Sequence, residues 1–234
     1  MRIGKWVSGT VFYVLVVAIF ITGSYLGSEV TTVVAAMIPL ERDHTIVIDA
    51  GHGGEDGGAT SVAGILESQY NLEIALRLDD LMHLLGYQTV MIRKTDVSVY
   101  TQGSSVAQKK VSDLKERVRI ANETENAVLV SIHQNTFADS RYSGAQVFYG
   151  AEGESLVLAE SMQTLLVSSL NPGSNRSAKA AKGIYLMEHI DCTGVLVECG
   201  FLSNQEEEAK LRDPEYQKKL CCVIGAAITN FLDH

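Results

Sequence analysis

The chain has 234 residues, of which 46% are hydrophobic and 20% are charged, and its formal net charge is −9 at pH 7. This composition is typical of a folded globular protein and excludes an intrinsically disordered one. The acidic balance, without any basic stripe, argues against nucleic acid as a partner, because a phosphate backbone attracts clustered lysine and arginine.

The N-terminal part of the chain differs from the rest. Two basic residues within the first five precede an uncharged, mostly apolar stretch over residues 6–26. A membrane-spanning helix needs about 20 apolar residues, and positive charges ahead of it favour keeping that end in the cytoplasm. We expect a signal anchor over residues 1–28, with a cleaved signal peptide as the alternative. A tether over residues 29–43 and one exported domain over residues 44–234 would follow.

Beyond the tether, short apolar runs alternate with helical patterns. We expect strands over residues 46–50, 87–92, 127–132, 145–149, 183–187 and 194–198, and helices over 67–85, 111–123, 155–170 and 220–231. Alternating strands and helices predict an α/β fold with a single domain. Its sheet should be twisted, mostly parallel and covered by helices on both faces.

The predicted helix over residues 111–123 carries an apolar face that includes Val111 and Ala121. Asp113 and Arg117 are four residues apart, so they are expected to pair on the solvent side of this helix. The predicted helix over residues 67–85 has apolar residues at helical spacing and is followed by a glycine, which is a common stop signal.

Four cysteines are present: Cys192, Cys199, Cys221 and Cys222. An exported protein can form disulfides, so a Cys192–Cys199 bridge is one possibility. Their spacing does not resemble a disulfide framework, and we favour buried, reduced side chains. Zinc binding by cysteine is disfavoured, because no Cys-x-x-Cys pair occurs.

Three short apolar runs each end in a residue that can bind a metal or move a proton. These residues are His52, His133 and Glu198. In an open parallel α/β sheet, ligands and catalytic groups gather beyond the carboxyl ends of the strands. The sequence therefore predicts that the three side chains meet at one edge of the sheet.

Glu67 opens the first long helix, directly after a glycine-rich loop that starts at His52. One interpretation is a carboxylate that interacts with the helix dipole. The other is a metal ligand, which with His52 and His133 would complete a two-histidine, one-glutamate set typical of catalytic zinc. Glu55 and Asp56 suit turn chemistry, and either could replace Glu67 as a ligand.

Glu198 needs a separate explanation, because it closes an apolar strand. It could bind an arginine or a helix N-terminus, or it could accept a proton from water and pass it to a leaving amine. Burial would raise its pKa toward that task. The acidic run over residues 206–208 is interpreted as a solvated helix start. No Gly-x-Ser-x-Gly motif supports a serine hydrolase.

The combined motifs resemble those of the zinc-dependent N-acetylmuramoyl-L-alanine amidases. The resemblance is carried by Val47–Gly54, Glu67, Ser131–Asn135 and Val195–Asn204, in the expected order. It implies that His52, Glu67 and His133 hold one Zn²⁺ and that Glu198 is the catalytic residue.

The resemblance further implies hydrolysis of the amide between the lactyl group of N-acetylmuramic acid and L-alanine of the peptidoglycan stem peptide. The compact size and single hydrophobic segment are most similar to the germination-specific (CwlD-type) amidases of spore formers. That type implies cortex maturation, with formation of muramic δ-lactam, and a location around the forespore. Membrane attachment would come from the N-terminal helix, and any control would come from outside the chain.

Two departures from the family pattern concern substrate fit. Gln134 stands where a small residue is usual, which predicts a narrower rim beside His133, and Cys192–Gly194 replaces a stretch that often carries proline. Two rival functions stay open. One is a non-catalytic wall-binding or regulatory protein, and the other is a zinc carboxypeptidase or endopeptidase that cuts the stem peptide itself.

Overall fold

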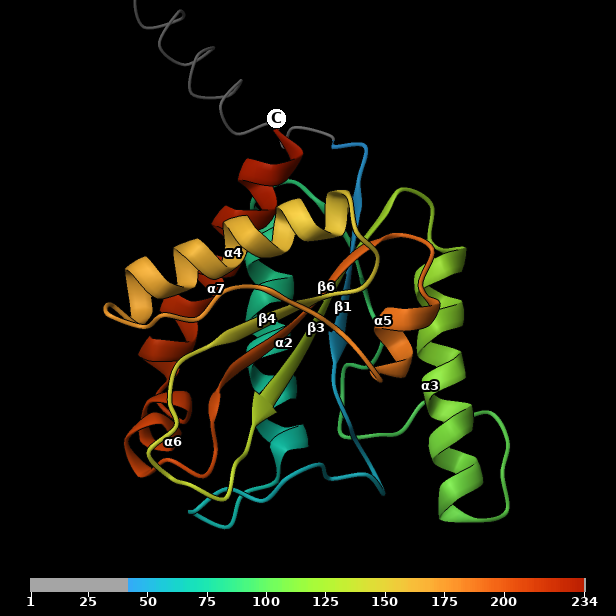
Figure 1. Cartoon of the computed structure of the whole chain (residues 1–234). Coiled ribbons are helices and arrows are strands. Elements are labelled where there is room, and N and C mark those ends of the chain that lie inside the picture. Colours follow the sequence, from blue (N-terminus) through green and yellow to red (C-terminus); the bar gives the residue numbers. More distant parts are fainter. Residues whose placement is uncertain (1–41, 234) are drawn as a thin grey trace, which may run out of the picture. The chain divides into compact units, whose positions relative to one another are not determined.

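The computed structural model describes residues 42–233 (Figure 1). The expected signal anchor and nearly all of the expected tether lie outside these residues. Within residues 42–233, no helix is both long enough and apolar enough to cross a membrane.

The described part of the chain contains a six-stranded sheet with the strand order β2-β1-β3-β6-β4-β5. The strands are β1 (Thr45–Ala50), β2 (Gln88–Met91), β3 (Ala127–Asn135), β4 (Gln146–Tyr149), β5 (Lys179–Ala180) and β6 (Thr193–Phe201). The helices are α2 (Glu67–Leu84), α3 (Val106–Glu123), α4 (Glu154–Leu170), α5 (Tyr185–His189), α6 (Gln205–Leu211) and α7 (Pro214–Leu232). All neighbouring strands pair in parallel except β4 and β6, which are antiparallel.

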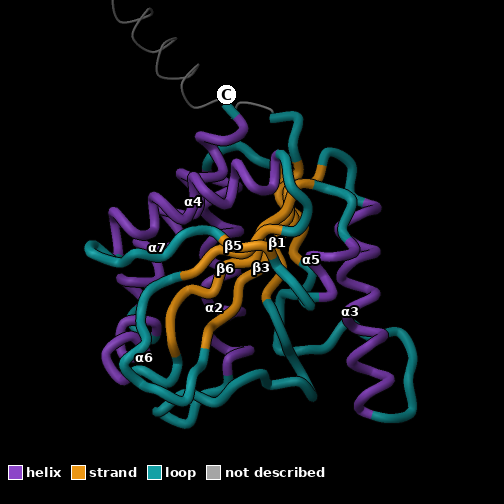
Figure 2. Tube along the Cα trace, in the orientation of Figure 1, coloured by secondary structure: helices purple, strands orange, loops and turns teal. Residues whose placement is uncertain are grey.

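Helices cover both faces of the sheet, as predicted (Figures 1 and 2). One hydrophobic cluster joins the sheet to α2, α4 and α7, and a smaller cluster joins the other face to α3 and α5. Successive residues of β1 divide between the two: Ile46 and Ile48 lie in the first cluster and Val47 in the second. A strand that is buried on both faces has apolar residues at successive positions, which explains why the sequence of β1 is almost continuously apolar.

Three expectations about secondary structure were wrong. Residues 183–187 do not form a strand: Tyr185–His189 form the short helix α5, whose Leu186 and Met187 pack into the smaller cluster. Helix α3 begins at Val106, five residues before the predicted start, and helix α7 begins at Pro214, six residues before its predicted start. Ser105 and Gln108 form a reciprocal capping box at the start of α3, a signal that lies outside the apolar face of the helix.

The strand order places β1, β3 and β6 side by side in the middle of the sheet, all running in the same direction. Their carboxyl ends therefore meet at one edge. His133 lies directly beside Glu198 in the register of β3 and β6, and Ala50, just before the His52 loop, lies beside Ile132. Chain segments more than sixty residues apart in the sequence thus converge at this edge.

Candidate metal centre

His52 follows β1 in a backbone conformation that is unusual for a histidine. Its φ angle is 59°, in the left-handed region, where a residue other than glycine carries a strain of order 1–3 kcal/mol. Arg117 on α3 fixes this conformation by donating a 2.8 Å hydrogen bond from Nη2 to the His52 carbonyl. The loop geometry at His52 therefore depends on a side chain from a different element.

Two buried arginines hold the end of β1. Arg93 donates to the carbonyls of Ala50 and Gly51 at 2.8 and 3.0 Å, and Arg117 donates to the Ala50 carbonyl at 3.0 Å. Arg117 also forms a buried ion pair with Asp49. Burial alone would raise the pKa of Asp49, but the Arg117 guanidinium and a hydrogen bond from Ser131 outweigh burial and lower that pKa.

Glu67 is the first residue of α2 and is almost completely buried. Its Oε1 accepts hydrogen bonds from the Gln134 backbone N–H at 3.1 Å and from Asn71 Nδ2 at 3.2 Å, and its Oε2 accepts one from the Ala59 N–H at 3.0 Å. These donors fix the carboxylate in one orientation. An interaction with the helix dipole alone would not require burial or this number of partners.

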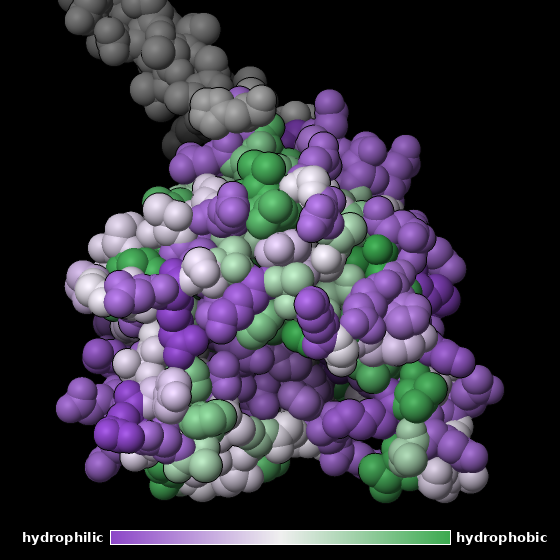
Figure 3. Space-filling view, viewed as in Figure 1, coloured by the Kyte–Doolittle hydropathy of each residue, from purple (hydrophilic) through white to green (hydrophobic). Residues whose placement is uncertain are grey.

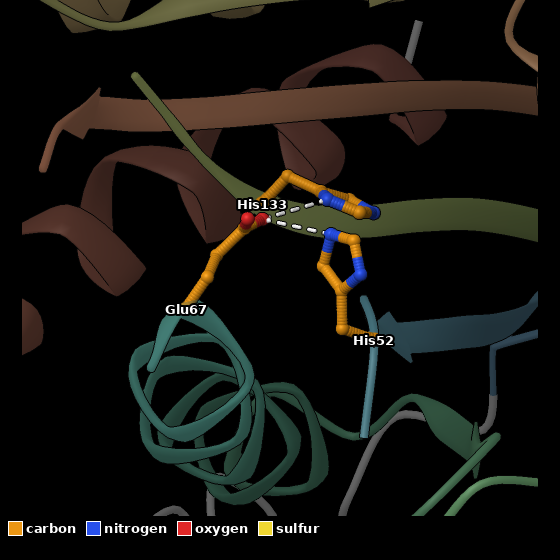
Figure 4. Close-up of side chains that lie close together, drawn as sticks. All are labelled: His52, Glu67 and His133. Atoms are coloured by element: carbon orange, nitrogen blue, oxygen red, sulfur yellow. Dashed lines mark hydrogen bonds and ion pairs between the residues drawn. The ribbon is translucent and has the colours of Figure 1, made fainter. Parts of the chain in front are cut away.

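Both histidines point one ring nitrogen at Glu67 (Figure 4). His133 Nδ1 lies 3.0 Å and His52 Nε2 lies 3.3 Å from Glu67 Oε1. Burial would raise the pKa of Glu67, but the hydrogen bonds from His133 and His52 outweigh it and lower that pKa, so the carboxylate is ionised. A metal ligand needs this ionised form.

One ligand atom from each of His52, Glu67 and His133 can be chosen so that all three lie within 4.8 Å of one another. This spacing lets one ion contact all three atoms. Two imidazoles and one carboxylate suit zinc and other first-row transition metals better than calcium or magnesium, which prefer oxygen ligands. The donor set therefore fits a single transition-metal ion.

Glycine at position 51 leaves room for the His133 ring. A Cβ atom added to Gly51 would lie 2.2–2.6 Å from three atoms of that ring, closer than any real contact. Gly58 has a similar role, because its Cβ would lie 2.6 Å from Glu67 Oε2 and 2.7 Å from His52 Cδ2. The glycine-rich sequence thus allows the three ligand side chains to approach the loop backbone.

Glu198 lies beside His133 on the neighbouring strand, and its Oε2 is buried without a hydrogen-bond partner within the described residues. Burial, aided by the nearby Glu67 carboxylate, raises the pKa of Glu198 to about 7, although the neighbouring imidazoles oppose this shift. Glu198, His52 and His133 line one cavity of about 220 Å³. In the view of Figure 1, the surface over the carboxyl end of β3 is hollowed and hydrophilic (Figure 3).

The structure separates Glu55 and Asp56, the alternative ligands to Glu67, from this group, and other histidines of the chain also lie outside it. Asp56 contacts the opposite side of the His52 ring, at Nδ1, and Glu55 pairs with Lys109. His83 is largely exposed on α2, and His189 lies on α5 with its ring stacked on Tyr185. His234 lies outside the described residues. All four cysteines are free, so the Cys192–Cys199 bridge is absent from the structure.

Three expectations about polar side chains were wrong. Arg117 does pair with Asp113, but it is only 3% exposed and points toward the sheet, whereas Val111 of the expected apolar face is exposed. Of the run over residues 206–208, Glu207 and Glu208 are buried. Glu207 accepts backbone hydrogen bonds from Gly144 and Phe201.

The third error concerns Gln134, which does not narrow the rim beside His133. Its side chain is buried and donates from Nε2 to Asn71 Oδ1 at 3.2 Å. Since Asn71 in turn donates to Glu67, Gln134 supports that carboxylate. Successive side chains of a strand point to opposite faces of the sheet, so the side chain of Gln134 points away from the cavity that His133 lines.

Arg93, Asn71 and Arg117 were not predicted to support the site. Arg93 could have been found, since it follows an apolar strand in the same way as His52 and His133. Asn71 and Arg117 carry no comparable signal, because each lies inside a helix and only the three-dimensional packing shows which face it occupies.

Comparison with known proteins gives a consistent result. Residues 46–230 match the protein family described as N-acetylmuramoyl-L-alanine amidase. The chain is 34% identical over 229 residues to the germination-specific N-acetylmuramoyl-L-alanine amidase of Bacillus subtilis, covering 97% of this chain and 94% of that relative.

Two solved structures are similar to this one. The CwlD amidase from Clostridioides difficile, in complex with the GerS lipoprotein, has 37% identity and a TM-score of 0.77, covering 81% of this chain and 98% of the solved chain. An N-acetylmuramoyl-L-alanine amidase from Clostridium difficile 630 has 29% identity and a TM-score of 0.70, covering 81% and 97%.

Proposed function

Because the chain belongs to the N-acetylmuramoyl-L-alanine amidase family, we propose that the site formed by His52, Glu67, His133 and Glu198 is where it hydrolyses peptidoglycan. The bond cleaved is the amide between the lactyl group of N-acetylmuramic acid and L-alanine of the stem peptide. The observation that carries this proposal is the placement of a second buried carboxylate, that of Glu198, directly beside the cluster of three ligand atoms.

We propose Zn²⁺ as the metal, one per chain, with His52, Glu67 and His133 as its ligands. Three protein ligands leave a coordination position open, which is the pattern of catalytic rather than structural zinc. When bound, zinc polarises a carbonyl oxygen and makes water a stronger acid.

Glu198 is proposed to move the proton. Its pKa of about 7 lies near neutral pH, where a carboxylate is most effective as both acceptor and donor. The carboxylate takes a proton from the attacking water and later gives it to the nitrogen of L-alanine as the carbon–nitrogen bond breaks. The remaining proton of the water passes from the new carboxyl group to the amine, so the products are a lactyl carboxylate on the glycan and a stem peptide with a protonated N-terminal amine.

The narrower biological role is also a proposal. The similarity to a germination-specific amidase supports action on spore cortex peptidoglycan, in the formation of muramic δ-lactam needed for germination. Such a role places the enzyme outside the cytoplasm, around the forespore, with attachment to a membrane through the N-terminal segment. Because the similar CwlD amidase was solved in a complex with a lipoprotein, we include a protein partner in this proposal.

Product analysis tests the proposed reaction. The full-length chain, purified in detergent with Zn²⁺, is incubated with vegetative and with cortex peptidoglycan, and the products are identified by mass spectrometry. We expect intact stem peptides that begin with L-alanine, together with glycan free of peptide. Shortened stem peptides would instead indicate a carboxypeptidase or endopeptidase. A protein that binds zinc and peptidoglycan without releasing any product would indicate a wall-binding role.

A further inference from the structure

We propose that Asp56 is a positioning residue that fixes the His52 ring for the metal. This inference rests on the proposed role of His52 as a ligand. The ring is held at both of its nitrogens: Nε2 lies 3.3 Å from Glu67 Oε1, and Nδ1 lies 3.1 Å from Asp56 Oδ2. Nε2 thus faces the other proposed ligands, while Nδ1 faces the Asp56 carboxylate, which is not itself part of the cluster.

Asp56 is itself firmly held. Its Oδ1 accepts a 3.2 Å hydrogen bond from the Gly58 N–H, and its Oδ2 lies 3.2 Å from Lys110 Nζ on α3. Its backbone exchanges two hydrogen bonds with Gly53, at 2.7 and 3.2 Å. Both carboxylate oxygens and both backbone groups are therefore engaged, so the side chain presents Oδ2 to His52 in one orientation.

This contact decides which nitrogen of His52 is free to bind. A carboxylate at Nδ1 accepts the ring proton there, which leaves the lone pair of Nε2 directed at the metal position. It also fixes the rotation of the ring, which the loop backbone alone does not determine. Such a partner behind a histidine ligand increases the affinity of the site for its metal, and loss of the partner typically weakens metal binding by about 10–100-fold.

The adjacent residue, Glu55, provides a comparison within the same turn. Glu55 Oε1 pairs with Lys109 Nζ at 2.6 Å, just as Asp56 pairs with the next lysine, Lys110. Both acidic residues therefore connect the glycine-rich loop to α3. Of these two acidic residues, only Asp56 also contacts a proposed metal ligand within the described part of the chain. A role limited to connecting the loop to α3 would make the two residues equivalent.

The substitution Asp56→Asn separates these roles. Asparagine has nearly the same shape and is well accepted in turns, so the loop should keep its fold. It offers one acceptor oxygen where aspartate offers two, so it cannot accept from His52 Nδ1 and from the Gly58 N–H at the same time. Glu55→Gln is the matched control, because it removes a loop–α3 ion pair of the same kind without touching His52.

The test measures Zn²⁺ affinity of the full-length chain in detergent, by competition with a chelator, without any substrate. We expect Asp56→Asn to weaken Zn²⁺ binding about 10–100-fold relative to wild type, and Glu55→Gln to leave it unchanged. The thermal unfolding midpoints of the two metal-free variants, followed by circular dichroism, should agree with that of the wild type. Asp56→Ala, which removes both acceptors, should weaken binding at least as much as Asp56→Asn.

Equal Zn²⁺ affinity of Asp56→Asn and wild type would overturn the proposal. An equal weakening by Asp56→Asn and Glu55→Gln would also overturn it, since the loss would then follow from loosening the loop. Because the readout is metal affinity and not turnover, a failure of the proposed amidase reaction would leave this test unaffected.

Discussion

A single carboxylate, Glu198, distinguishes the proposed catalytic centre from a simple metal-binding cluster. It lies beside His133 in the register of β3 and β6, but its Oε2 has no hydrogen-bond partner among the described residues. An unpaired buried polar atom is unfavourable for stability, so its persistence points to a functional requirement. This requirement can be separated from metal binding by mutation.

We predict that Glu198→Gln retains Zn²⁺ binding but loses at least about 100-fold in kcat, because glutamine keeps the shape of the side chain and cannot carry the proton. Steady-state release of stem peptides, with zinc content measured on the same samples, provides the check. Glu160→Gln, on the exposed surface of α4, serves as the control and should behave like wild type. Stem-peptide release by Glu198→Gln at the wild-type rate would show that another group moves the proton.

Gly51 provides a second prediction at the scale of one residue. Alanine at this position places its Cβ within 2.2–2.6 Å of the His133 ring, so the ring must move away from the other ligands. We expect Gly51→Ala to weaken Zn²⁺ binding by more than 10-fold in a chelator competition. The control is Gly225→Ala in α7, where the nearest atom is the flexible end of Leu81 at 3.0 Å. Similar affinities for the two variants would contradict the proposed position of His133.

At the scale of elements, the contact between α3 and the end of β1 determines the shape of the His52 loop. Arg117 crosses from α3 to pair with the buried Asp49 and to donate to the carbonyls of Ala50 and His52. The helix thus contributes a buried charged group to the sheet edge in place of an apolar one. Removing one partner of such a pair leaves the other charge buried and costs about 3–5 kcal/mol.

We therefore predict that Arg117→Met lowers the free energy of unfolding by about 3–5 kcal/mol at pH 7. The difference should depend on pH. In the wild type, the pKa of Asp49 is below its unfolded value, so this residue stabilises the fold above about pH 4 and that stabilisation is lost as the pH falls further. In the variant, burial without Arg117 should raise the pKa of Asp49 above its unfolded value. Protonation at lower pH then removes the destabilisation caused by the buried, unpaired carboxylate.

The wild-type and Arg117→Met proteins should consequently become more similar in stability as the pH falls from 7 to 4. Urea unfolding of both metal-free proteins, followed by circular dichroism across this range, measures the difference. A difference in unfolding free energy that stays constant with pH would mean that Asp49 does not titrate as the geometry requires.

At the scale of the whole molecule, the parallel arrangement of β1, β3 and β6 explains why the sequence was informative about the site. Three apolar runs ending in His52, His133 and Glu198 predicted a common sheet edge, and the strand order places their ends together. The fold class follows from the same alternation of strands and helices. These features are predictable because each depends on a local pattern and on one general rule for parallel sheets.

The features that were not predicted depend on packing between elements. The spacing of apolar residues predicted an amphipathic helix over residues 111–123 with Val111 on its buried face. In the structure, the packing of α3 buries Arg117 and exposes Val111. The acidic start of α6 resembles a solvated helix, yet Glu207 is buried because the backbone N–H groups of Gly144 and Phe201 need an acceptor. In each case a charged residue satisfies polar groups of a distant segment, and no local pattern reveals that partner.

The most direct test of the central claim is anomalous diffraction at the zinc absorption edge from crystals of the protein grown with Zn²⁺. We predict one peak per chain, with His52 Nε2, His133 Nδ1 and a Glu67 oxygen each at about 2.0–2.2 Å, and with Glu198 beside it but not bound. A peak bound by a set of residues that excludes Glu67 or either histidine, or no peak at this edge of the sheet, would contradict the account.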